Sequence, residues 1–249
     1  MSQRKLDVLV PTWNNEGQMI ALINSLSIIG FFSKGDRRLI VINNGKQPIK
    51  EQCAEIINTG NMLVIDCEEN RGWEGGLVEG LKASDAEFVC FQNDDTHIPQ
   101  NGTDFYDKLM DSFTSDAGII APISTTAAGI QSIYNPKTPI MMSEVRWVIF
   151  LCAMMKRSDL DAVGGVDETL PGGDDFDLSI RMRKAGKKLY VNPYAFLIHH
   201  GFQTGTRVKG DSDKEGGWNS LQMQERTNKA LIQKHGFRTF IETLQRQIV

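Results

Sequence analysis

The sequence lacks a long apolar run, an excess of positive charge and any Cys-x-x-Cys pair. Its longest apolar stretches stay well short of the ~18 residues that a membrane-spanning helix needs, and residues 1–7 carry charge without an apolar core. The formal net charge of -4 provides no basic field for non-specific binding to nucleic acid. The four scattered cysteines are expected to be reduced core thiols. We expect a cytoplasmic protein, with peripheral contact at a membrane left open.

The chain has 249 residues, 41% of them hydrophobic, which is enough for one substantial core. Short apolar runs at 6–10, 39–42, 62–65 and 88–91 favour buried strands and alternate with stretches compatible with helices. This alternation predicts a parallel, doubly wound α/β sheet. We find no internal repeat and expect one domain over residues 1–249.

The second half of the chain has α+β character. Residues 122–143 form an irregular excursion, and the pattern beyond it predicts a strand at 145–155, a helix at 175–185 and short strands at 189–199. Glycine and charge dominate residues 201–217, which predicts a mobile flap with Arg207 and Lys209 as phosphate contacts. The apolar residues of the tail share one helical face, which is expected to dock on the body or, in a homo-oligomer, on a partner subunit.

The segment Phe88–Pro99 is a hydrophobic run that delivers acidic residues at its carboxyl end. Ligands of open α/β sheets bind at that edge. A hard divalent cation, Mn²⁺ or Mg²⁺, prefers oxygen ligands, so carboxylates placed there can hold it against a diphosphate. We predict Asp95 as the metal ligand, with Asp94 or Asn93 facing the ribose or the waters on the metal. An isolated Asp-Asp pair is more simply a solvated turn, so the case depends on the other motifs.

A glycine loop at Gly172 and Gly173 leads into the predicted helix, whose start carries Asp174, Asp175 and Asp177. N-cap and first-turn positions favour ionised carboxylates because free backbone N–H groups and the helix dipole point at them. An ionised Asp can accept the proton of an attacking hydroxyl. We predict Asp175 as the general base, and Asp174 as either the alternative base or a ligand of acceptor hydroxyls. Helix capping alone explains one of these acids but not all three.

Two histidines, His199 and His200, end the apolar run at 189–198. A neutral imidazole can complete a metal site made of carboxylate and phosphate oxygens. Adjacent strand residues point to opposite faces, so one of the two is expected to serve, and we favour His199.

The loops after the first three predicted strands carry side chains suited to a nucleotide. Pro11 would fix the first turn and Trp13 would cover a ring, while the amides of Asn43 and Asn44 would read a base edge. The third loop is rich in glycine and offers Arg71 to a phosphate. Each loop alone fits ordinary turn chemistry, but their common place at successive strand ends favours a binding site.

These motifs, in this order between about Leu6 and Gly201, resemble those of the family 2 glycosyltransferases. The resemblance implies the GT-A fold, an α/β architecture with a Rossmann-like, mostly parallel central sheet flanked by helices and a smaller acceptor-side α+β part. Residues 1–100 would then form the nucleotide-sugar-binding half and residues 101–217 the acceptor-side half with its flap. Residues 218–249 would be C-terminal helices.

The resemblance also implies roles for individual residues. The residues that would surround the nucleotide are Pro11, Thr12, Trp13, Asn14, Asn43, Asn44, Asn70 and Gly72. Asn93-Asp94-Asp95 looks like the family's Asp-x-Asp motif, which makes Asp95 the metal ligand, and His199 or His200 falls where the family's metal histidine lies. The run Gly173–Leu178 is similar to the family's Glu-Asp-x-Asp-Leu, whose second acid is the base, here Asp175.

Three positions depart from the family pattern. Asn43 stands where many members carry an Asp that reads uracil, Asn93 replaces an acid of the metal motif, and Asp174 replaces a Glu. The resemblance still implies inversion by a single displacement, with Mn²⁺ or Mg²⁺ and a nucleoside diphosphate sugar as donor, UDP-sugars being favoured. A hexosyltransferase is therefore expected.

The acceptor is left open between a glycan, a lipid-linked sugar, a protein and a modified nucleobase, all of which present hydroxyls. Two other function classes compete with this one. A non-catalytic nucleotide-sugar-binding module would use the same loops without turnover. A nucleotidyltransferase would also use acids and a metal, but the glycine-rich, basic signature near its first strand is missing here.

Overall fold

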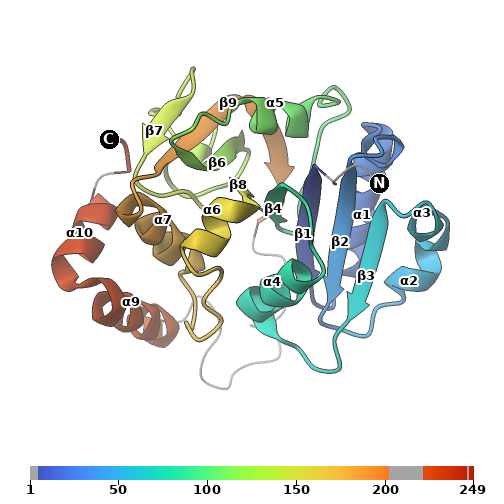
Figure 1. Ribbon diagram of the computed structural model, residues 1–249, viewed down its shortest axis with the longest axis horizontal. Helices are drawn as coiled ribbons and strands as arrows, with labels where there is room; N and C mark the ends of the chain where they lie inside the picture. The colour runs from blue at the N-terminus through green and yellow to red at the C-terminus, as the bar shows by residue number, and fades with distance from the viewer. Residues whose placement is uncertain (1–4, 202–220, 246) are drawn as a thin grey trace.

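The computed structural model describes residues 5–201, 221–245 and 247–249. Its frame is a nine-stranded sheet in the order β3-β2-β1-β4-β8-β6-β9-β5, with β7 paired to β9 (Figure 1). Strands that run in one direction are β1 (Leu6–Thr12), β2 (Arg37–Asn43), β3 (Met62–Asp66), β4 (Phe88–Gln92), β6 (Ala117–Ser124) and β9 (Lys188–His199). Strands that run the opposite way are β5 (Thr96–His97), β7 (Ser143–Val145) and β8 (Cys152–Lys156). The mostly parallel sheet predicted from the sequence is confirmed.

Helices cover both faces of the sheet. They are α1 (Glu16–Ile28), α2 (Ile49–Gln52), α3 (Ala54–Asn58), α4 (Gly72–Lys82), α5 (Phe105–Asp111), α6 (Arg157–Ala162), α7 (Asp174–Lys184), α9 (Leu221–His235) and α10 (Phe237–Gln245). One buried cluster joins α1 and α5 to the sheet, and a second joins α4, α6 and α7 to it. The sheet therefore lies between two apolar layers, as a doubly wound fold requires.

Strand β1 illustrates why the first strands carry apolar residues on both faces. All of its residues are buried, and alternate side chains enter different cores. Leu6, Val8 and Val10 pack in the cluster with α1, whereas Leu9 packs with Leu77 of α4 in the other. Since successive strand residues point to opposite faces, a strand with helices on both sides needs apolar residues on both of its faces.

Two of the predicted boundaries are wrong. Strand β1 continues through Pro11, which pairs with Ile42, instead of ending in a turn there. The pairing of β1 with β4 stops at Leu9, so the missing N–H of Pro11 leaves no ladder bond unmade on that side. The predicted strand at 145–155 is two strands, β7 and β8, separated by an irregular segment that enters the cleft described below.

The C-terminal helices α9 and α10 lie beside α7 at the left of Figure 1. In α10, Phe240 is buried, as the predicted docking of the tail requires, whereas Phe237 is 65% exposed. No helix among the described residues is long and apolar enough to cross a membrane. The cysteines are free thiols. The predicted flap lies, from residue 202 onward, outside the described residues, as do Arg207 and Lys209.

Candidate active site

A cleft of about 1030 Å³ lies at the carboxyl ends of β1 and β4. Its walls come from segments far apart in the chain: the loop after β1, the turn after β4, the starts of α4 and α7, the end of β9, and α9. The sequence-predicted residues that line it are Pro11, Thr12, Trp13, Asn44, Asn70, Gly72, Asn93, Asp94, Asp95, Asp174, Asp175 and His199. The fold thus brings most of the candidate residues to one cavity.

One end of the cleft joins Asp95, after β4, to His199, at the end of β9. Asp95 Oδ1 lies 3.2 Å from His199 Nε2. His199 Nδ1 lies 2.6 Å from the carbonyl oxygen of Thr126, which can only accept, so Nδ1 carries a proton and Nε2 faces Asp95. Apart from this imidazole, the buried Asp95 Oδ1 has no hydrogen-bond partner among the described residues. Burial lowers the pKa of His199, but the hydrogen bond to Asp95 and its negative charge outweigh burial and raise the pKa above its ordinary value.

The neighbouring acid, Asp94, ties this turn to the end of β1. Its Oδ2 accepts a hydrogen bond from Thr12 Oγ1 at 2.6 Å, and its Oδ1 accepts one from Asn15 Nδ2 at 3.0 Å. Asn93 extends its Nδ2 to within 3.4 Å of His199 Nε2. Both carboxylate oxygens of Asp94 therefore serve the fold, and Asp95 is the acid of this turn with an oxygen left for a ligand.

The start of α7 forms another part of the cleft wall. The N-cap is Gly173, in the left-handed region with a φ of 77°. Asp174 is therefore the first helical residue, and the prediction that it is the N-cap is wrong. A Cβ on Gly173 would lie 2.8 Å from Thr227 Cγ2, so glycine also permits α9 to pack closely here. Asp174 and Asp175 both lie in the first turn and both face the cleft.

Three carboxyl groups lie together where the start of α7 meets the start of α4: Asp174, Asp175 and Glu74 of α4. Burial raises the pKa of Asp174 to about 6, against a 2.9 Å hydrogen bond from Trp73 Nε1 that lowers it. Burial, followed by the negative charge of Asp174, raises the pKa of Asp175 well above its ordinary value. The same two causes raise the pKa of Glu74 to about 7. The cluster therefore retains protons at mildly acidic pH, and hydrogen-bond donors or a cation entering the cleft would favour its ionised form.

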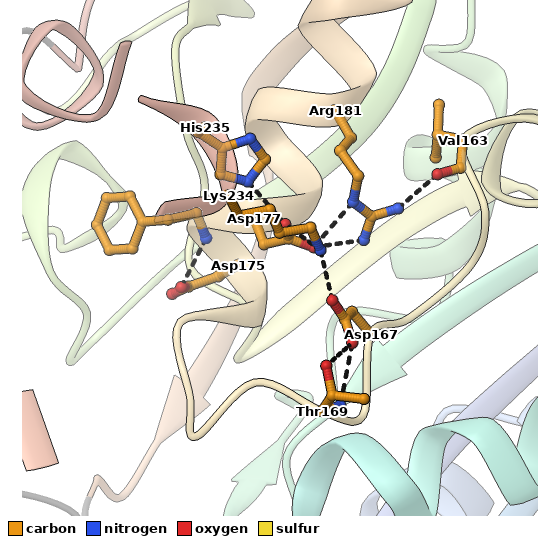
Figure 2. A network of polar contacts seen from close by, with 9 residues as sticks. Val163, Asp167, Thr169, Asp175, Asp177, Arg181, Lys234 and His235 are labelled. Atoms are coloured by element: carbon orange, nitrogen blue, oxygen red, sulfur yellow. Dashed lines mark hydrogen bonds and ion pairs between the residues drawn. The ribbon is translucent and has the colours of Figure 1, made fainter. Parts of the chain in front are cut away.

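The third acid of the helix, Asp177, does not line the cleft, and it holds α9 against α7 (Figure 2). Its Oδ1 accepts hydrogen bonds from Lys234 and His235, each at 2.7 Å, and its Oδ2 accepts from Arg181 at 2.6 Å. Lys234 also reaches Asp167 at 2.6 Å. Burial raises the pKa of Asp177, but the hydrogen bonds from Arg181 and Lys234 outweigh it and hold the pKa below its ordinary value. Asp177 is a structural anchor for the helix that presents Asp175.

Replacement of Asp177 by Ala should lower the free energy of unfolding at pH 7 by about 3 kcal/mol, since removal of one partner leaves the facing cations uncompensated. Because the folded pKa of Asp177 is lowered, its contribution is complete at pH 7 and fades only as the pH falls through that pKa. Urea unfolding measures the change. The control is Glu242→Ala, which removes an exposed pair with Arg238 and should leave stability unchanged. Equal stability of both variants would contradict the anchoring role.

Two predicted nucleotide residues, Asn14 and Asn43, do not line the cleft. Asn14 takes a positive φ of 50° in the loop after β1. Asn43 is buried, and its Nδ2 donates to Asp66 Oδ1 at 2.8 Å and to the carbonyl oxygen of Gln47 at 2.9 Å. The Asn43 side chain therefore holds the ends of β2 and β3 together, and its role toward a base stays a prediction.

Arg71 and His200 also lie outside the lining. The Arg71 guanidinium lies 3.4 Å from Glu79 and 3.3 Å from Glu168, so carboxylates already engage the predicted phosphate ligand. His200 Nε2 lies 2.9 Å from His97 Nδ1, on the other side of the strand end from His199. Of the two histidines, the geometry therefore favours His199 as a metal ligand.

The cleft also contains residues that sequence reasoning missed. They are Glu74, the segment 126–128, the segment 149–151, and Met223, Gln224, Thr227, Asn228 and Leu231 of α9. A signal for Glu74 exists in the sequence, since it is an acid between glycines at the start of a helix. In the sequence it falls in the glycine-rich loop after the third predicted strand, where no role is predicted for it. The wall formed by α9 carried none, because its place beside α7 depends on contacts between residues 58 positions apart, such as His235 and Asp177.

Solved structures with similar folds define the class of this protein. The mannosyltransferase PcManGT from Pyrobaculum calidifontis, solved with GDP-Man and Mn²⁺, aligns with a TM-score of 0.64 at 14% identity over 98% of this chain and 75% of its own. Residues 1–349 of S. aureus TarS, solved with UDP-GlcNAc, align with a TM-score of 0.63 at 16% identity over 96% of this chain and 71% of their own. The fold is the GT-A fold that the sequence predicted.

Sequence comparison assigns the family. Residues 7–163 match the family described as Glycosyl transferase family 2. The chain is 29% identical to Uncharacterized protein Rv1525 of Mycobacterium tuberculosis, over 80% of this chain and 75% of that protein. It is 24% identical to the pre-mycofactocin glycosyltransferase of M. tuberculosis, over 80% of this chain and 43% of that protein. The chain belongs to glycosyltransferase family 2.

Proposed function

We propose that this glycosyltransferase moves a hexose-type sugar from a nucleoside diphosphate to an acceptor hydroxyl, with Mn²⁺ or Mg²⁺ and with inversion at the anomeric carbon. The convergence of Asp95, His199 and Asp175 on one cleft carries the proposal. The nucleotide would lie over the ends of β1 and β2, in the half formed by residues 1–100. The acceptor would enter from the half formed by residues 101–217 and from the C-terminal helices.

The chemistry of the lining supports a divalent cation. Five carboxylates line the cleft, at Glu74, Asp94, Asp95, Asp174 and Asp175, and the described part of the lining contains no Lys or Arg. A diphosphate entering alone would meet, among the described residues, a lining in which acidic side chains predominate. Within the described ranges, no three His, Cys, Asp or Glu side chains are grouped closely enough to hold a metal by themselves.

Asp95 and His199 would therefore hold the cation in part, with diphosphate oxygens supplying further ligands. The pair fits that role because one buried oxygen of Asp95 has no other hydrogen-bond partner within the described part of the chain, and His199 directs Nε2 toward it. When bound, the cation would stabilise the charge of the departing diphosphate.

Asp175 would accept the proton of the acceptor hydroxyl while the hydroxyl oxygen bonds to the anomeric carbon and the bond from that carbon to the diphosphate breaks. A carboxylate with a raised pKa is a stronger base than an ordinary Asp, which suits Asp175 to this task. Asp174, held by Trp73, is the alternative base or a ligand of acceptor hydroxyls. Glycans, lipid-linked sugars, proteins and modified nucleobases remain candidate acceptors.

Thermal unfolding with UDP, GDP, UDP-glucose, UDP-GlcNAc and GDP-mannose tests this proposal. A nucleotide at about 100 times its Kd stabilises the fold by about 2.7 kcal/mol, which raises Tm by roughly 5–10 °C in a chain of this size. The shift should require Mn²⁺ or Mg²⁺ and disappear with EDTA. Release of sugar from the stabilising donor then reports turnover. Absence of any nucleotide shift would overturn the proposed function, and binding without turnover with any acceptor class would favour a binding module.

A further inference from the structure

Glu74 is a buried acid whose hydrogen-bonding capacity is not fully satisfied by the described residues. It lies in the first turn of α4, is 5% exposed, and lines the cleft. Its Oε1 has no hydrogen-bond partner among the described residues. A buried carboxyl oxygen without a donor is costly, so its retention at this place calls for a partner that arrives with the ligand.

The position of Glu74 identifies the part of the cleft that it serves. The adjacent Trp73 donates its Nε1 to Asp174 Oδ2 at 2.9 Å, which joins the start of α4 to the start of α7. The start of α4 also packs on the nucleotide side, because a Cβ on Gly76 would lie 3.0 Å from Pro11 and 3.2 Å from Asn44 Nδ2. Glu74 therefore lies between the proposed nucleotide position and the proposed base.

The transferred sugar must occupy the same place. Its anomeric carbon is bonded to the diphosphate on one side and meets the hydroxyl activated by Asp175 on the other. A sugar ring presents hydroxyl donors, which are the groups that an unpaired carboxyl oxygen accepts. The acids that face Glu74 repel its charge, with Asp174 as the main source, and the described lining offers no Lys or Arg to compensate. Hydroxyl donors from the ligand would satisfy this demand.

We propose that Glu74 is a specificity-determining residue that accepts a hydrogen bond from a ring hydroxyl of the sugar being transferred. The inference rests on the proposed function, since it needs a nucleoside diphosphate sugar in the cleft. It predicts that Glu74 distinguishes donors by the sugar and is indifferent to the nucleotide. A purely structural role at the start of α4 would instead affect all ligands alike.

Calorimetric titration of Glu74→Gln in Mn²⁺ tests the inference with two ligands: UDP, and whichever of UDP-glucose, UDP-galactose and UDP-GlcNAc the unmodified protein binds most tightly. The Kd for UDP should stay within about twofold. The Kd for the UDP-sugar should rise about 10-fold, because the neutral amide oxygen is a weaker acceptor than the carboxylate and the amide nitrogen can only donate. Glu55→Gln, the same change on the exposed surface of α3, should alter neither.

Donors that lack single hydroxyls complete the test. For the deoxy donor without the recognised hydroxyl, Glu74→Gln should bind as tightly as the unmodified protein, because the two changes remove the same contact. Equal weakening of UDP and UDP-sugar, or none, would overturn the inference and leave the proposed function intact. Failure of the unmodified protein to bind UDP or GDP would overturn both. A Glu74→Asp variant, tested in parallel, should bind UDP normally and the UDP-sugar weakly.

Discussion

Replacement of Asp175 by Asn should lower kcat for sugar transfer by about 10²- to 10⁴-fold, the usual contribution of a general base. The Kd for UDP in Mn²⁺ should change little, because the proposed role of Asp175 is toward the acceptor hydroxyl, and Asp95 and His199 are the proposed metal ligands. Initial rates at saturating donor and acceptor, with calorimetry for UDP, measure the two quantities. Asp111→Asn, an exposed Asp on α5 outside the cleft, is the matched control.

The pH profile gives this prediction a second readout. Transfer requires ionised Asp175, so kcat should rise as the pH rises through a pKa that lies well above that of an ordinary Asp. The charge of Asp174 is the largest cause after burial, so Asp174→Asn should move the acid limb to lower pH. Unchanged transfer by Asp175→Asn would remove the assignment of the base, and Asp174 would then be the acid to test.

Replacement of His199 by Ala should weaken Mn²⁺ binding in the presence of UDP by at least about 10- to 100-fold, the cost already seen for groups that only orient a ligand. Transfer should fall at least as far, because the cation balances the diphosphate in a cleft lined by five carboxylates. Mn²⁺ titration followed by electron paramagnetic resonance measures the affinity.

His200→Ala is the control for this prediction. It removes the adjacent imidazole, which contacts His97 and does not line the cleft, so Mn²⁺ affinity should be retained. A larger loss of Mn²⁺ affinity in His200→Ala than in His199→Ala would assign the metal to His200. It would also require a conformation at the end of β9 different from the one described. Equal retention in both variants would contradict a protein imidazole at the metal.

The sequence predicted the fold and the chemical classes of the site residues because each signal is local. An apolar run in β1 or β4 reports a strand buried on both faces, and acids at Asp94 and Asp95 report the strand end where ligands bind. Local signals gave the wrong prediction where one residue type fits both a turn and a strand. The proline at residue 11 reads as a turn, yet it fits inside β1 because its neighbour β4 has already stopped pairing.

Sequence also could not divide labour among adjacent acids. Asp94 and Asp95 are equivalent as letters, and only the reach of Thr12 and Asn15 to Asp94 leaves Asp95 facing His199. Asp177 looked like a member of a catalytic cluster, but Lys234 and His235 make it an anchor. Each of these partners lies at least 57 residues away along the chain, and no sequence pattern specifies such a contact.

By itself the amino-acid order determined a doubly wound α/β body, an acid-bearing strand end and an acid-rich helix start, since periodicity and residue type encode these features over a few residues. Tertiary packing alone decided that Glu74 is buried with an oxygen unpaired among the described residues, that α9 walls the cleft, and that the charge of Asp174 raises the pKa values of Asp175 and Glu74. Burial and charge coupling depend on distances between elements, and those distances exist only once the chain has folded.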